Sequence, residues 1–100
     1  MLFAVFFEDD VEHADARRRL MPAHLDFLAS NPAILAAGPL QDAASGEGAG
    51  GLWLVEAEDA NAVRPLYEGD PFWPTGLRKS VRVLRLSRVF ADGRRISPPA

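Results

Sequence analysis

The chain has 100 residues, of which 48% are hydrophobic and 25% charged, and its formal net charge is −3. This length and mix are typical of one globular domain, and the acidic balance argues against a nucleic-acid-binding surface. The lack of cysteine excludes disulfides, thiol catalysis and cysteine-based zinc sites. Because His13 and His24 show no metal-ligand spacing, we expect neither a metal nor another cofactor.

Residues 2–7, Leu-Phe-Ala-Val-Phe-Phe, form an apolar run whose length and aromatic content predict a β-strand. Alternate side chains of a strand point to opposite faces, so both faces of this strand are apolar. We expect a second copy of the chain to bury the outer face. The alternative is a cover formed by the C-terminal tail or the glycine-rich loop. The run is too short for a signal or membrane segment, so we expect a cytoplasmic protein without membrane contact.

Residues 13–30 show the 3.6-residue repeat of a helix, and His24 lies near the middle of the apolar face. Pro22 falls inside this stretch, where it lacks an amide hydrogen and clashes with the preceding turn. We therefore expect the helix to kink or restart at Pro22. A restart would place His24 in the first turn, where the helix dipole disfavours the imidazolium form.

Three further strands are predicted over residues 33–40, 52–56 and 80–90. A second helix is predicted over residues 59–67. Asp59 is the expected N-cap of this helix. Residues 42–51 contain four glycines and predict a flexible hairpin loop.

The resulting order, β-α-β-β-α-β, is that of an α+β, ferredoxin-like fold. It predicts a four-stranded antiparallel sheet with both helices on one face. The other face would be bare, and two such sheets packed face to face would bury it in a homodimer. We expect one domain over residues 1–91 and a loose tail over residues 92–100.

His24 and Asp70 are the candidate catalytic residues. A buried imidazole needs hydrogen-bond partners, and a neutral imidazole beside a carboxylate can act as a general base. The alternative for His24 is a structural bond to a backbone carbonyl. Asp70 precedes a proline and therefore lies at an ordered turn, where it could instead form an Asx-turn or a cap. Spacing along the chain does not show whether the two side chains meet.

The other candidate residues are predicted to line a substrate-binding pocket rather than to act as catalytic groups. Gly38 and Pro39 can shape a pocket wall, or they can simply end a strand. Phe72 and Trp73 can line an apolar pocket, although aromatic residues also serve as core. Residues 46–51 contain no lysine and precede a strand, unlike a phosphate-binding loop.

The last strand is basic, with positive side chains at Arg78, Lys79, Arg82, Arg85 and Arg88. We interpret these side chains as edge protection or as partners of nearby acids. An RNA-recognition domain has the same element order, but no strand carries its aromatic signature and the net charge is negative.

Three segments together resemble the YciI-like (YCII-related) family: residues 21–28, 37–40 and 69–77, which contain Met-Pro-Ala-His-Leu, Ala-Gly-Pro-Leu and Gly-Asp-Pro-Phe. The resemblance covers the chain from the first strand to about residue 90. It implies a dimeric α+β barrel with a pocket beside the sheet.

The resemblance also implies a His-Asp pair, which maps onto His24 and Asp70. Family members often carry arginine where this chain has Met21, so a role of that arginine in anion binding is not carried over.

Two hypotheses for function follow. One is a cofactor-free enzyme that catalyses elimination, isomerisation or hydrolysis of a small molecule. The other is a non-catalytic, ligand-binding or accessory dimer.

Overall fold

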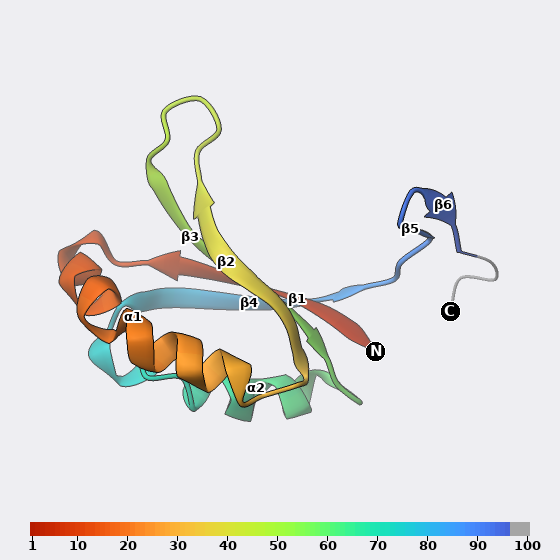
Figure 1. The fold of residues 1–100 in the computed structure, drawn as a ribbon, viewed down its shortest axis with the longest axis horizontal. Coiled ribbons are helices and arrows are strands. Elements are labelled where there is room, and N and C mark those ends of the chain that lie inside the picture. The colour runs from red at the N-terminus through yellow and green to blue at the C-terminus, as the bar shows by residue number, and fades with distance from the viewer. Residues whose placement is uncertain (97–100) are drawn as a thin grey trace.

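The computed structural model of the protein describes residues 1–96. Within this range, the main sheet has four antiparallel strands in the order β2-β3-β1-β4 (Figure 1). Their bounds are β1 Leu2–Asp9, β2 Ile34–Gln41, β3 Gly48–Glu56 and β4 Arg78–Leu86. The chain order of strands and helices confirms the predicted ferredoxin-like α+β fold.

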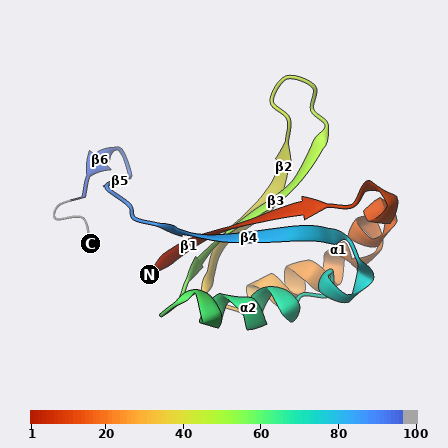
Figure 2. The ribbon, with the colours of Figure 1, turned by 180° about the vertical axis from the view of Figure 1, so that it is seen from behind.

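Both long helices lie against the same face of the main sheet (Figures 1 and 2). The helical elements are η1 Val11–His13, α1 Ala14–Ala29, α2 Ala60–Glu68 and η2 Trp73–Thr75. Asp59 caps α2 as predicted, since its side chain accepts a hydrogen bond from the Ala62 amide at 3.0 Å. No helix among residues 1–96 is long and apolar enough to cross a membrane.

Helix α1 runs through Pro22 without a break, so of the predicted kink or restart the restart is wrong, and the kink stays a prediction. Pro22 is exposed, and the helix extends by several residues on both sides of it. The remaining backbone hydrogen bonds and the packing of α1 on the sheet therefore outweigh the cost of about 3 kcal/mol that an internal proline imposes. His24 lies ten residues after the start of α1, so the helix dipole argument does not apply to it.

Strand β3 begins at Gly48, so the loop predicted over residues 42–51 is shorter than expected. Gly50 has φ +99°, and a Cβ there would lie 1.8 Å from the carbonyl oxygen of Phe7. A glycine is needed at this point because β3 passes too close to β1 for any side chain. Here the glycine serves close strand packing rather than loop flexibility.

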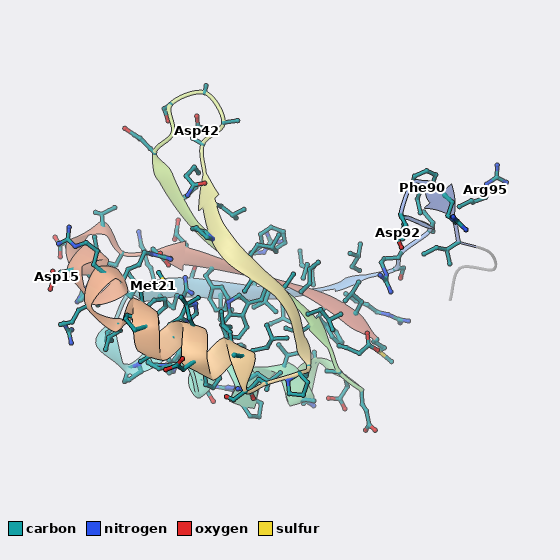
Figure 3. The ribbon with its side chains drawn as sticks, in the orientation of Figure 1. Asp15, Met21, Asp42, Phe90, Asp92 and Arg95 are labelled. Atoms are coloured by element: carbon teal, nitrogen blue, oxygen red, sulfur yellow. The ribbon has the colours of Figure 1, made fainter. Side chains whose placement is uncertain are left out.

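The last predicted strand is also corrected, because β4 ends at Leu86 rather than at residue 90. Beyond it, β5 (Phe90–Ala91) pairs with β6 (Arg94–Arg95) in a separate hairpin. Figure 3 shows this hairpin extending away from the main sheet. The loose tail predicted over residues 92–100 includes residues 97–100, which lie outside the described residues. The domain boundary at residue 91 stays a prediction.

The core lies between the main sheet and the helices. It is built from the helix-side residues of β1, which pack with β3 and α2 residues; its buried members are Phe3, Val5, Phe7, Trp53, Val55 and Val63. Their burial follows from the alternation of side chains along β1.

The opposite face of the sheet is also largely apolar, although its pairing includes Arg82 opposite Phe6 and Glu56 opposite Leu2. Cross-strand pairing places seven hydrophobic side chains on it, at Leu2, Ala4, Phe6, Leu52, Leu54, Leu84 and Leu86. We call this surface the open face. Leu2 is only 7% exposed within the single chain, against the expectation that it would be open to water. Phe6 and Leu84, in contrast, are 38% and 42% exposed, as expected for a face without a cover.

Candidate functional site

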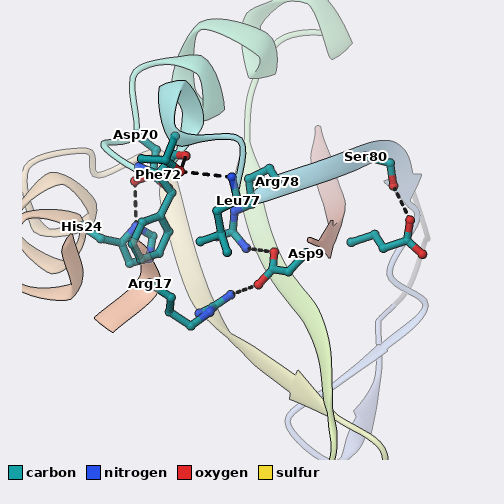
Figure 4. Close-up of polar contacts among 10 residues, drawn as sticks. Asp9, Arg17, His24, Asp70, Phe72, Leu77, Arg78 and Ser80 are labelled. Atoms are coloured by element: carbon teal, nitrogen blue, oxygen red, sulfur yellow. Dashed lines mark hydrogen bonds and ion pairs between the residues drawn. The ribbon is translucent and has the colours of Figure 1, made fainter. Parts of the chain in front are cut away.

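His24 and Asp70 meet, although 46 residues separate them along the chain (Figure 4). The Nδ1 atom of His24, on α1, lies 2.8 Å from Oδ1 of Asp70, in the turn after α2. Their side chains are 8% and 3% exposed. Because an ionised carboxylate only accepts hydrogen bonds, Nδ1 is the donor in this contact, and Nε2 is the ring nitrogen that remains for another partner.

The turn around Asp70 holds the carboxylate in place. Oδ1 of Asp70 also accepts a hydrogen bond from the backbone amide of Phe72 at 3.1 Å. The carbonyl oxygen of Asp70 accepts a second one from the amide of Trp73 at 2.9 Å. The Asx-turn and the His24 contact, which were alternatives in the sequence, therefore occur together.

Aromatic rings fix the plane of the His24 imidazole. The Phe72 ring stacks on it with a centroid distance of 4.1 Å and an interplanar angle of 18°. The Trp53 ring is farther away, with its centroid 6.4 Å from that of the imidazole and its plane tilted by 30°. With Nδ1 held by Asp70 and the ring plane held by Phe72, His24 is restricted to one orientation.

A second polar cluster lies beside this pair (Figure 4). Asp9, at the end of β1, accepts a hydrogen bond from Arg78 Nη1 at 2.9 Å through Oδ1. Its Oδ2 accepts one from Arg17 Nη2 on α1. We call this group the Arg17–Asp9–Arg78 cluster.

Sequence reasoning found this cluster only in part. Of the two roles expected for Arg78, edge protection or pairing with a nearby acid, its contact with Asp9 confirms the second, but the burial of its side chain, which is only 3% exposed, was not expected. One signal was available, because Arg17 precedes His24 by seven residues and two helical turns place them on one side of α1. No local pattern indicates that Arg78 points inward.

The Arg78 guanidinium lies in an apolar setting. Its Cζ atom is 4.2 Å from the centroid of the Phe7 ring and 5.2 Å from that of Phe72. Burial lowers the pKa of Arg78 from its ordinary value, while the hydrogen bond to Asp9 acts in the opposite direction. Within residues 1–96, the buried Nε of Arg78 has no hydrogen-bond partner.

Two cavities adjoin these groups. The small cavity, of about 80 Å³, is lined by His24, Arg17, Arg78, Gly38 and Pro39 among others. The large cavity, of about 490 Å³, also includes Arg17 and Pro39 but not His24. The large cavity has the size of a ligand site, whereas the chemistry lies in the small one. The shared lining residues make them neighbouring parts of one site.

The predicted binding residues fall in different places. Gly38 and Pro39 line the small cavity, and Phe72 lies against the His24 ring. Trp73 instead packs on Tyr67, with ring centroids 5.1 Å apart. A role of these residues in substrate binding stays a prediction. Within residues 1–96, no group of three or more His, Asp or Glu side chains could hold a metal ion.

Comparison with known proteins agrees with the fold. The family model of the YCII-related domain matches residues 1–87. The chain is also similar to 5-chloro-2-hydroxyhydroquinone dehydrochlorinase (TftG) from Burkholderia phenoliruptrix AC1100, solved in complex with 2,5-dihydroxybenzoquinone. The TM-score is 0.74 and the identity 31%, covering 86% of this chain and 93% of that chain. No curated protein sequence matches the chain.

Proposed function

This chain belongs to the YCII-related family, and we propose that it is a cofactor-free lyase in which His24 removes a proton from a small substrate. The observation that carries the proposal is the buried contact between His24 Nδ1 and Asp70 Oδ1 at 2.8 Å, beside the small cavity. A histidine oriented by a carboxylate, with its second nitrogen free, is a common form of general base.

The proposed reaction is an elimination. Nε2 of His24 takes a proton from the substrate, and the electron pair of that bond is held as a phenolate or enolate. This pair then forms a new double bond while the leaving group departs, with its own bonding electrons, as an anion from a saturated carbon of the ring in its keto form. His24 then gives the proton to water, so the substrate loses one molecule of acid. Asp70 stabilises the imidazolium that forms in between.

The similar solved structure favours elimination over isomerisation or hydrolysis. That protein is named a dehydrochlorinase of a chlorinated hydroxyhydroquinone, and its complex holds a dihydroxybenzoquinone. Identity of 31% and coverage of 86% support a related reaction class in this chain. The sizes of the two cavities, about 490 and 80 Å³, suit one substituted ring with its reacting edge at His24.

The test is chloride release. Purified protein is mixed with 5-chloro-2-hydroxyhydroquinone, and both chloride and the absorbance of the product are followed. We expect turnover by the natural protein and a loss of about 10²–10⁴-fold in His24→Gln, the usual contribution of a general base. Equal turnover by both proteins would overturn the proposal.

A non-catalytic, ligand-binding role is the second candidate. The observation that favours it is the burial of the pair, since side chains that are 8% and 3% exposed also tie α1 to the turn after α2. Binding of 2,5-dihydroxybenzoquinone without turnover of any chlorinated analogue would favour this role.

We also propose that the protein is a homodimer with two open faces packed together. The support is the apolar open face, where Phe6 and Leu84 stay 38% and 42% exposed in the single chain. Burying each such side chain contributes about 1.5–3 kcal/mol. A cytoplasmic location belongs to the same proposal, and cell fractionation would test it.

A further inference from the structure

The Arg17–Asp9–Arg78 cluster carries more positive than negative charge. Two guanidinium groups share the single carboxylate of Asp9. Both arginines line the small cavity together with His24, and Met21, which lies one helical turn after Arg17, adds no charge there. The cluster by itself therefore carries one net positive charge beside the cavity that holds the proposed base, and the carboxylate of Asp70, which also acts on Arg78, offsets this charge.

Arg78 also has a hydrogen-bond donor to spare. Its Nη1 donates to Asp9, but its buried Nε has no partner within residues 1–96. A buried donor without a partner costs about 1–3 kcal/mol and more when it is charged, so native proteins keep few of them. An oxygen atom of a ligand in the small cavity could accept from this guanidinium after a small shift.

The residues around Arg78 fix the position of its guanidinium. Its Cζ lies 4.2 Å from the centroid of the Phe7 ring, which fixes it against the core. Gly51 makes room on another side, because a Cβ at that position would lie 3.2 Å from Arg78 Nη1 and 3.4 Å from the carbonyl oxygen of Gly38. The position of the charge is thus set by buried rings and backbone rather than by solvent.

We propose that Arg78, assisted by Arg17, binds the anionic oxygen of the substrate, which is a phenol or enol whose conjugate base forms as His24 takes the proton. This inference rests on the proposed elimination. It names the substrate class by its acidity: a neutral hydroxylated ring that becomes a phenolate or enolate.

The charges of the site suit such a substrate. Before reaction, the neutral His24 lies beside the negative Asp70, and the cluster holds one excess positive charge. Moving one proton from the substrate to Nε2 makes the His24–Asp70 pair neutral. It also creates a negative oxygen opposite the positive cluster, where low local polarity strengthens the attraction.

The test uses 4-nitrophenol, a ring compound whose anion is coloured and which has no leaving group. Binding is measured over a pH series by absorbance, so that the pKa of the bound phenol is compared with that of the free phenol. We expect the natural protein to lower this pKa, because the cluster binds the anion more tightly than the neutral phenol.

Arg78→Met should abolish the preference for the anion and weaken its binding by at least about tenfold, since a hydrogen bond between charged groups exceeds one tenfold step in affinity. Arg17→Met should show a smaller change. The matched control is Arg18→Met, on the same helix as Arg17. The side chain of Arg18 is 80% exposed and pairs with Asp15. If Arg78→Met fails to fold, the comparison of Arg17→Met with the Arg18→Met control decides whether the inference holds.

The outcomes separate this inference from the proposed reaction. An unchanged or raised pKa of the bound phenol, no binding to the natural protein, or equal binding by the arginine variants and the control would overturn the inference. His24→Gln should keep the preference for the anion. If His24→Gln also keeps turnover, the proposed reaction fails while the binding role of Arg78 stands.

Discussion

Nδ1 of His24 and Oδ1 of Asp70 lie 2.8 Å apart between the middle of α1 and the turn after α2. The same Oδ1 accepts the amide hydrogen of Phe72, whose ring in turn stacks on the imidazole at 4.1 Å. One short turn therefore supplies both the hydrogen bond and the ring that orient His24. This double support is what we expect of a side chain that must hold one position.

Replacing His24 by glutamine tests whether the site is catalytic. We expect turnover to fall by about 10²–10⁴-fold because no other group at this position can take the proton. His13→Gln is the matched control, since His13 is 44% exposed and pairs with Asp10 at 3.3 Å. Steady-state kinetics with both variants, together with melting curves, would separate lost chemistry from lost stability. A large fall in melting temperature with unchanged turnover would contradict the catalytic role.

Replacing Asp70 by asparagine keeps the shape of the turn but removes the charge beside His24. We expect turnover to fall by about 10–100-fold, because a neutral amide orients the ring less firmly and does not stabilise the imidazolium. Asp26→Asn, an exposed position on α1, is the control. The measurement is the rate at saturating substrate. An Asp70→Asn variant as active as the control would rule out this role for the carboxylate.

The open face predicts self-association. We expect the natural protein to sediment as a dimer at micromolar concentration and Leu84→Asp to sediment as a monomer, because a charge opposes burial of this face. Asn61→Asp adds the same charge at an exposed position of α2 and should leave the dimer intact. Analytical ultracentrifugation gives the masses. A monomeric natural protein would disprove the face-to-face arrangement.

Two glycines of β3 should respond differently to alanine. Gly50→Ala should destabilise the protein by more than about 2 kcal/mol, since φ is +99° and the new Cβ would lie 1.8 Å from the Phe7 carbonyl oxygen. Gly48→Ala should have little effect, because nothing lies within 4 Å of its Cβ position. Urea denaturation of both variants measures the difference. Similar midpoints would show that the close approach of β1 and β3 can relax.

The hairpin loop between β2 and β3 should depend on pH through Asp42, which Figure 3 labels beside this loop. Hydrogen bonds from the backbone amides of Ser45 and Ala44 lower the pKa of Asp42 from its ordinary value of 3.8. A lowered pKa means that the contribution of these hydrogen bonds to the stability of the loop is fully present above the ordinary value and is lost as pH falls through the lowered one. An NMR titration of the Asp42 carboxyl and the Ser45 amide measures this, and a pKa at the ordinary value would contradict it.

Much of the fold could be predicted from local patterns. The apolar run Leu2–Phe7, the helical repeat around His24 and the capping residue Asp59 each indicate one element, and their order indicates the topology. The errors lie at the end of the last strand, which stops at Leu86, at Pro22 and in the glycine run at Gly48–Gly51. The last two have one cause. There, packing against distant strands outweighs the local preference for a break or a loop.

By itself, the sequence determined the element types, their order and the presence of His24 on an apolar helical face, because these depend on spacing along the chain. Only the tertiary structure decided that Asp70 reaches His24 and that Arg78 turns inward onto Asp9. Such contacts depend on strand register and on the rotation of α1 over the sheet, which set distances between segments far apart in sequence. The residue types name the chemistry that is available, and the packing selects which groups meet.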